Sequence, residues 1–227
     1  MPTHNPFTEQ PDTWWDPKGP FWTLHAINPL RLNYILSYIQ SGKALDVGCG
    51  GGILSSSLAQ SFEVTGIDTD KALLDIARQH ASSHLLNIQY QHQLLGELTP
   101  SKENAFDLVT CLEVLEHVDN PEQMIIDIAS IVKPGGYVFF STLNRNVISY
   151  LGAIVAAEYI LKILPKHTHE YQKFITPNEL ITAATQAGLE LKNLNGILYN
   201  PLLKTFSIGS ITTINYIACF RKPLGKQ

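Results

Sequence analysis

The chain has 227 residues, 44% of them hydrophobic and 16% charged, which is typical of a soluble globular protein with enough apolar material for one sizeable core. Its 20 Asp and Glu residues outnumber its 16 Lys and Arg residues, and the net charge of −4 excludes a strongly basic surface of the kind that binds nucleic acid. The three cysteines form no CxxC motif, and the chain shows neither a secretion signal nor an uncharged apolar stretch of about 20 residues. We therefore expect a cytoplasmic protein without a transmembrane span.

Residues 1–40 are expected to form an irregular arm followed by a helix. Five prolines fall within the first 20 residues, which disfavours regular structure there. Apolar residues recur at helical spacing from residue 29 to residue 40 and predict a helix over that range. We interpret residues 1–40 as an N-terminal lid on the domain that follows.

Predicted strands and helices alternate through residues 41–143. The expected strands are KALDVGC (43–49), FEVTGID (62–68), NIQYQH (87–92), AFDLVTCL (105–112) and YVFFSTL (137–143). The expected helices are ILSSSLAQS (53–61), DKALLDIARQHASS (70–83) and NPEQMIIDIASIVK (120–133). Asp68 or Asp70 is expected to cap the second helix, and Asn120 to cap the third, which has Pro121 at its first position. This alternation predicts an α/β fold with a Rossmann-like, doubly wound, mostly parallel sheet, whose ligands bind beyond the carboxyl ends of the strands.

The alternation breaks over residues 144–175, which we interpret as an inserted lid within a single domain. Residues 147–164 are apolar except for Glu158 and Lys162, so they are a poor membrane span but suit an interfacial helix. A lid helix packed on the core is the alternative. Residues 176–227 are expected to add a helix, TPNELITAATQAG, and two closing strands, LELKNLNGILYNP and ITTINYIACF.

The segment LDVGCGGGIL (45–54) has four glycines in five positions directly after a predicted strand. A dinucleotide fingerprint needs glycines at offsets 0, 2 and 5; Gly48 and Gly50 satisfy the first two, but the third position is an isoleucine. The Asp46 carboxylate would repel a pyrophosphate and favour a positively charged ligand, whereas Asp68, at the end of the second strand, can accept hydrogen bonds from ribose hydroxyls. S-Adenosyl-L-methionine (SAM) carries both a ribose and a sulfonium cation, so the segment indicates a SAM-binding loop. A structural turn and a variant phosphate loop are the alternatives.

LDVGCGGG followed by VTGID resembles the first two motifs of the Rossmann-like methyltransferases. A more specific resemblance, to the ubiquinone-biosynthesis O-methyltransferases (the UbiG family), extends from Trp14 to Cys219. The segments that carry it are WWD (14–16), LHAINPLRL (24–32), LDVGCGGGIL (45–54), LEVLEHV (112–118), VKPGG (132–136), FFSTLNRN (139–146), AEYIL (157–161), KFITP (173–177) and LYNP (198–201).

The resemblance implies a class I SAM-dependent O-methyltransferase. Its acceptors would be phenolic hydroxyls of polyprenylated intermediates, 2-polyprenyl-6-hydroxyphenol and 3-demethylubiquinol, at two steps of ubiquinone biosynthesis. Cofactor binding is implied for Arg31, Gly48, Asp68 and Leu112. Arg31 would hold the methionine carboxylate, and Leu112 would pack against adenine.

Methyl transfer to a phenol requires loss of its proton, because an ordinary phenol has a pKa of about 10. The segment CLEVLEHVDN (111–120) places Glu113, Glu116 and His117 just after the fourth predicted strand. These three residues are the candidate catalytic group and the candidate ligands of a divalent metal ion that lowers the proton affinity of the attacked oxygen. The resemblance implies Mg²⁺ here, although a histidine ligand suits Zn²⁺ or Mn²⁺ better. The alternatives are His117 as a metal-free general base oriented by one of the acids, and a structural turn with solvated acids.

Further candidates for contact with the substrate are Asn144 and Arg145 in TLNRN and His169 in THEYQKF. Because a polyprenylated substrate partitions into lipid, we expect peripheral contact with the inner face of the cytoplasmic membrane through residues 147–164. A complex with other ubiquinone-biosynthesis proteins is also expected, and nucleic acid is not expected as a partner. The alternative functions are methylation of another small molecule, a non-catalytic SAM-binding subunit of a lipid-synthesis complex, and an NAD-dependent enzyme.

Overall fold

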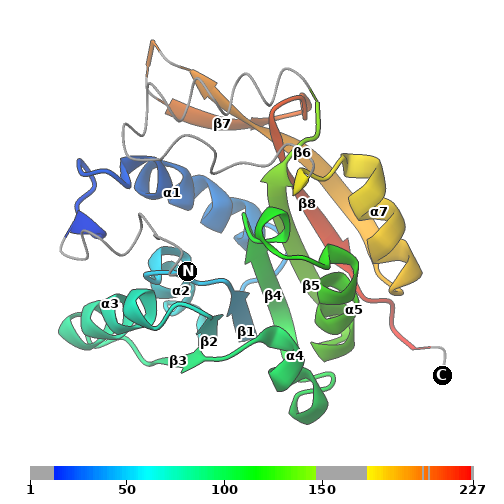
Figure 1. The fold of residues 1–227 in the computed structure, drawn as a ribbon, viewed down its shortest axis with the longest axis horizontal. Helices are drawn as coiled ribbons and strands as arrows, with labels where there is room; N and C mark the ends of the chain where they lie inside the picture. Colours follow the sequence, from blue (N-terminus) through cyan, green and yellow to red (C-terminus); the bar gives the residue numbers. More distant parts are fainter. Residues whose placement is uncertain (1–12, 147–172, 201, 204, 226–227) are drawn as a thin grey trace.

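The computed structural model describes residues 13–146, 173–200, 202–203 and 205–225. The strands of these residues form one sheet with the order β3-β2-β1-β4-β5-β8-β6-β7, and helices cover both of its faces (Figure 1). The strands are β1 (Gly42–Val47), β2 (Phe62–Asp68), β3 (Ile88–His92), β4 (Phe106–Leu112), β5 (Val132–Leu143), β6 (Glu190–Asn200), β7 (Thr205–Gly209) and β8 (Asn215–Arg221). Strands β1 to β5 pair in parallel, whereas β8 is antiparallel to β5 and β6, and β7 is antiparallel to β6. The predicted doubly wound, mostly parallel fold is confirmed.

Each longer helix after α1 begins where the sequence supplies a cap or a turn. The helices are α1 (Trp22–Leu36), α2 (Ile53–Leu58), α3 (Lys71–Ser83), α4 (Leu95–Leu98), α5 (Pro121–Ile131) and α7 (Pro177–Gln186), with short 3-10 turns η2 (Thr99–Ser101) and η3 (Leu115–His117). The Asp70 carboxylate accepts hydrogen bonds from the first turn of α3, and the Asn120 side chain accepts one from α5. Thr176 and Glu179 form a capping box at the start of α7. The predicted caps of α3 and α5 are thus confirmed, with Asp70 and not Asp68 at α3.

The central strands are apolar on both faces because helices pack on both. Val109 and Phe140 point to the core shared with α4, α5 and α7. Their neighbours Leu108 and Phe139 point to the core shared with α1 and α2. This two-sided burial holds β1, β4 and β5 rigidly and fixes the position of the loops at their carboxyl ends.

Four expectations about elements need correction. The helix predicted to start at Pro29 begins at Trp22, so that the proline lies inside it and not at its preferred first position. Strand β5 starts at Val132 and includes the VKPGG segment, and its pairing with β4 shifts register between Phe106 and Leu108. Strand β7 and helix α4 were not predicted from the sequence.

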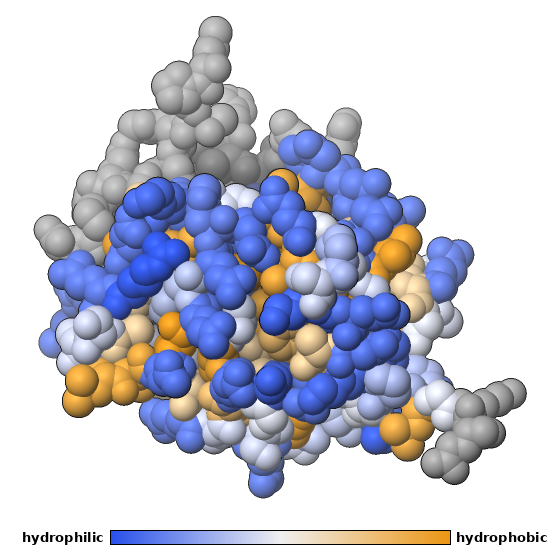
Figure 2. All heavy atoms as spheres, turned by 90° about the horizontal axis from the view of Figure 1, so that it is seen from below, coloured by the Kyte–Doolittle hydropathy of each residue, from blue (hydrophilic) through white to orange (hydrophobic). Residues whose placement is uncertain are grey.

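Within the described ranges, no helix is long and apolar enough to cross a membrane. The face of the molecule in Figure 2 is mostly hydrophilic, with hydrophobic residues in small separate groups. The predicted interfacial helix over residues 147–164 and the candidate His169 lie outside the described residues.

Candidate functional site

The loop between β1 and α2 adopts conformations that favour glycine. Gly48, Gly50 and Gly52 have φ angles of 68°, 52° and 85°, in the left-handed region. A Cβ atom at Gly48 would lie 2.4 Å from Val114 Cγ2, and one at Gly50 would lie 3.3 Å from the Trp14 ring. The loop is therefore held between the segment that follows β4 and the N-terminal arm.

Asp46 lies beneath this loop. Its side chain is buried, and its carboxylate accepts hydrogen bonds from Ser55 Oγ at 2.6 Å and Thr110 Oγ1 at 2.8 Å. Burial raises the pKa of the Asp46 carboxyl above its ordinary value, and the two hydrogen bonds oppose that shift. Because both oxygens bond protein hydroxyls, the cofactor interaction predicted for Asp46 would act through its charge and not through direct contact.

Asp68 ties the end of β2 to the glycine loop. Its Oδ2 accepts a hydrogen bond from the Gly50 amide at 2.8 Å, and its Oδ1 accepts one from the Asp70 amide at 2.8 Å. The structure therefore brings the acid and the glycine loop together, as a shared cofactor site requires. The ribose contact itself stays a prediction.

Residues 13–21 of the N-terminal arm cover the loop and the start of α3. Trp14 is 5% exposed and packs with Phe21, Ile53, Leu73 and Ile76. Its ring lies against Gly50 and would collide with a Cβ atom at the next residue. An aromatic cover on the glycine loop fits the predicted N-terminal lid, whose function stays a prediction.

Arg31 of α1 forms a partly buried ion pair with Glu113 at the carboxyl ends of β4 and β5. Its Nη2 lies 2.6 Å from Glu113 Oε1 and 3.5 Å from Ser141 Oγ, and the Arg31 side chain is only 11% exposed. The Ser141 hydroxyl donates to the same Glu113 oxygen at 2.7 Å. Arg31 Nε is buried and, within the part of the chain that the structure describes, has no hydrogen-bond partner. A cation with such a donor can hold an anionic group of a ligand.

Glu116 is the most deeply buried carboxylate of the turn after β4. It is 5% exposed, and Thr142 Oγ1 donates to its Oε2 at 2.8 Å. Burial, together with the negative charge of Glu113, raises the pKa of Glu116 to about 8. A carboxyl group with such a pKa can accept a proton near neutral pH, which an ordinary glutamate does poorly.

The three predicted metal ligands have different neighbours in this structure. Glu113 pairs with Arg31, Glu116 accepts a hydrogen bond from Thr142, and His117 is exposed at the end of η3. In the part of the chain that the structure describes, no group of three or more His, Cys, Asp or Glu side chains is arranged to hold a metal ion. The carboxyl groups of Glu113 and Glu116 do interact with each other, through charge and a hydrogen bond. A shared metal site and a common catalytic role of the three residues stay predictions.

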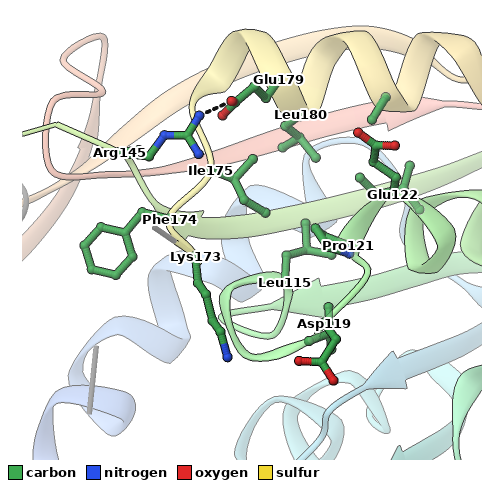
Figure 3. A pocket seen from close by; sticks show the side chains of 13 residues that line it. Leu115, Asp119, Pro121, Glu122, Arg145, Lys173, Phe174, Ile175, Glu179 and Leu180 are labelled. Atoms are coloured by element: carbon green, nitrogen blue, oxygen red, sulfur yellow. Dashed lines mark hydrogen bonds and ion pairs between the residues drawn. The ribbon is translucent and has the colours of Figure 1, made fainter. Parts of the chain in front are cut away.

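The other candidates occupy different positions. Leu112, at the end of β4, packs with the core on the α1 side of the sheet. Asn144 holds the loop before β8 through bonds to the carbonyl oxygens of Thr212 and Ile214. Arg145 pairs with Glu179 at the edge of a cavity of about 330 Å³ between α5 and α7 (Figure 3). The adenine contact of Leu112 and the substrate contacts of Asn144 and Arg145 stay predictions.

The lining of the cavity combines apolar and charged residues. The apolar lining residues include Leu115, Ile125, Phe174, Ile175, Leu180 and Ala183, and the charged ones are Asp119, Glu122, Arg145, Lys173 and Glu179. Leu115 lines this cavity and precedes Glu116 in the chain, but Glu116 itself is not among the lining residues.

Two partners of the acids, Ser141 and Thr142, were missed from the sequence. Both lie on β5 and are fully buried, and each bonds one glutamate of the turn after β4. The signal available was FFSTL, two consecutive hydroxyl residues at the end of an otherwise apolar strand.

Residues 29–194 match the model of a family described as a methyltransferase domain. A ubiquinone biosynthesis O-methyltransferase of Bordetella avium is 47% identical over 213 residues, which cover 92% of this chain and 88% of that protein. One of Coxiella burnetii is 48% identical over 217 residues, covering 94% of this chain and 92% of that protein.

Solved structures are similar in fold. A magnesium protoporphyrin IX methyltransferase of Synechocystis with bound SAH has a TM-score of 0.66 at 18% identity, with 93% of this chain and 91% of that chain covered. A SAM-dependent methyltransferase of Methanosarcina mazei has a TM-score of 0.65 at 22% identity, with 84% and 97% covered. At these identities the structural likeness concerns the fold alone, whereas the sequence relatives match over most of their own length.

Proposed function

This chain belongs to the family of the ubiquinone biosynthesis O-methyltransferases, and we propose that it transfers the methyl group of SAM to a phenolic hydroxyl of a polyprenylated intermediate in ubiquinone biosynthesis. The observation that carries the proposal is the placement of two complementary groups at one edge of the sheet. Arg31 keeps a buried donor unused beside the glycine loop, and Glu116 is a buried carboxyl group with a raised pKa. Arg31 could bind the carboxylate of the cofactor, and Glu116 could accept the proton of a phenol.

On the cofactor side, each group of SAM has a counterpart. Asp68 would accept hydrogen bonds from the ribose hydroxyls, and Arg31 would bind the methionine carboxylate. The backbone at Gly48 and Gly50 permits close approach of the ligand, and Leu112 would contact adenine. Together these residues would hold the sulfonium methyl group toward the turn after β4.

On the acceptor side, Glu116 would remove the phenolic proton. The phenolic oxygen attacks the methyl carbon, the carbon–sulfur bond breaks, S-adenosylhomocysteine leaves, and the proton passes to Glu116. A carboxylate with a pKa of about 8 is closer to the phenol in proton affinity than an ordinary glutamate is. Proton transfer to Glu116 is therefore less unfavourable.

A divalent ion is the second route by which the acceptor oxygen could be activated, and it is favoured by the proximity of two carboxylates that repel each other. Glu113, Glu116 and His117 would hold the ion after rearrangement, and a bound ion lowers the proton affinity of a phenolic oxygen. A chelator separates the routes, because it abolishes turnover only where the ion is required. Restoration of turnover by added Mg²⁺, Mn²⁺ or Zn²⁺ would identify the metal.

The cavity between α5 and α7 is the proposed site of the polyprenyl chain. Its lining includes Leu115, Ile125, Phe174, Ile175, Leu180 and Ala183, and Leu115 directly precedes Glu116 in the chain. We also propose peripheral membrane contact through residues 147–164 and association with other proteins of the pathway. Liposome co-sedimentation that is unchanged on deletion of residues 147–164 would contradict the membrane proposal.

The experiment that tests the function uses purified protein, SAM and a short-chain prenylated catechol. We expect a monomethyl ether and S-adenosylhomocysteine in equal amounts. SAM binding without any product would instead indicate a non-catalytic subunit or another acceptor.

A further inference from the structure

We infer that Glu113 is a positioning residue for the cofactor: it holds the Arg31 guanidinium so that Arg31 can bind the methionine carboxylate. This inference rests on the proposed SAM-dependent function. It gives Glu113 a role of its own, although its carboxyl group also interacts with that of Glu116.

The contacts of Arg31 place one end of its guanidinium. Glu113 Oε1 accepts from Arg31 Nη2 at 2.6 Å and from Ser141 Oγ at 2.7 Å. This oxygen is therefore fixed from β5 and in turn fixes the arginine of α1. The Arg31 side chain is 11% exposed and that of Glu113 is 30% exposed, so the pair is partly shielded from solvent.

A second donor of the same guanidinium has no acceptor among the described residues. This donor is Nε, which is buried. Buried donors are rarely left in that condition, and a guanidinium binds a carboxylate well through several of its donors. A ligand carboxylate would satisfy Nε while Glu113 keeps Nη2.

The backbone at Glu113 places this pair next to the glycine loop. Glu113 has a φ angle of 57°, which is rare for a residue other than glycine, and its amide donates to the Ser141 carbonyl at 2.8 Å. The next residue, Val114, packs on Gly48 so closely that a Cβ atom there would collide with it. The strained turn therefore brings Glu113 to the cofactor loop.

The positive charge of Arg31 also acts on Asp46, the acid beneath the glycine loop, because it opposes the rise in the pKa of that carboxyl group. Arg31 is thus an electrostatic neighbour of the acid beneath the glycine loop as well as a direct partner of Glu113. Loss of the Glu113 charge should consequently weaken the binding of the ligand carboxylate that contacts Arg31. It should leave the binding of the adenosine unchanged.

The test compares two ligands by calorimetry. S-Adenosylhomocysteine carries the amino-acid carboxylate, whereas 5′-methylthioadenosine has the same adenosine and thioether but lacks it. We expect Glu113→Gln to weaken the first ligand by about tenfold or more and the second by less than about twofold. Glu113→Asp, which keeps the charge, should restore part of the loss. The matched control, Glu116→Gln, should leave both affinities within about twofold.

Equal losses for both ligands in Glu113→Gln would overturn the inference, because they would indicate a general disturbance of the loop. Unchanged binding of both ligands with reduced turnover would also overturn it and return Glu113 to the acceptor. If the wild-type protein binds neither ligand, the proposed function fails, and this outcome is distinct from the other two.

Discussion

The glycine loop after β1 and the turn after β4 lie at the same edge of the sheet, but different interactions hold them. The loop, with Asp68, depends on backbone conformation and on amide hydrogen bonds between residues close in the chain or on adjacent strands. The turn depends on side chains brought from far away: Arg31 lies 82 residues from Glu113, and Thr142 lies 26 residues from Glu116. By function, we assign the loop, Asp68 and the Arg31–Glu113 pair to the cofactor side, and Glu116 with its partner Thr142 to the acceptor side.

This difference has a functional consequence. A site formed by backbone groups has a fixed shape. Such a site suits a part of the ligand that does not change during the reaction, such as the adenosine of SAM. A buried carboxyl group with a raised pKa, such as Glu116, can change its protonation, which proton removal from an acceptor requires. Substitutions should therefore affect affinity on the cofactor side and turnover on the acceptor side.

The largest expected effect is that of Glu116→Gln. The amide cannot accept the phenolic proton, so we expect kcat to fall by about 100-fold or more, while SAM affinity changes by less than about 1 kcal/mol. Steady-state kinetics and calorimetry on the same preparation provide the measurement. Turnover within about threefold of the wild type would break the division between the two sides.

The raised pKa of Glu116 also predicts how stability and kcat depend on pH. Because the folded-state pKa of Glu116 is about 8 and its ordinary value is 4.5, the folded protein binds more protons between these values than the unfolded chain does. The Glu116 contribution to stability is therefore present below about pH 4.5 and is lost as pH rises toward 8, whereas kcat should rise over the approach to pH 8. Thermal melts of Glu116→Gln should lack this decline, and identical melting profiles for the two proteins would contradict the shift.

On the cofactor side, Asp68→Ala should weaken SAM binding by roughly 1–3 kcal/mol, because the ribose loses a charged acceptor and the Gly50 amide loses its partner. The change in kcat at saturating SAM should be small. Asp70→Ala is the matched control, since Asp70 caps α3 and should cost about 1 kcal/mol of stability without affecting affinity. Equal affinity losses in both variants would mean that helix stability, and not ribose contact, is being measured.

The proposed tail cavity extends the acceptor side. Ala183→Phe would fill part of the cavity and displace about two methylene groups of the chain, so we expect KM for a prenylated catechol to rise by about tenfold. An unprenylated catechol should be methylated as before. Ala187→Phe is the control, because Ala187 packs on the same core but does not line the cavity. If both acceptors are affected equally by Ala183→Phe, the cavity does not hold the tail.

What could be predicted from the sequence follows the same division. The ends of β2, the cap at Asp70 and the glycine loop are encoded by neighbouring residues, and these predictions agree with the structure. The partners Ser141 and Thr142 depend on the parallel pairing of β4 with β5, in which Leu112 lies opposite Ser141, and no local pattern specifies that register. For the same reason, the spacing of Glu113 and Glu116 along the chain does not reveal that Arg31 and Thr142 are their further partners.

The smallest expected effect comes from a site remote from both sides. Leu85 is the residue after the C-cap of α3. It has a φ angle of 55° and is 94% exposed, so a leucine occupies a position that favours glycine. Leu85→Gly should relieve this strain and stabilise the protein by about 1 kcal/mol, because the left-handed conformation costs glycine nothing and no buried contact is lost. A rise in Tm with unchanged SAM affinity and unchanged kcat would show that global stability changes neither property at this scale. A change in either property would mean that the losses at Asp68 and Glu116 must be corrected for stability before they are assigned to the two sides.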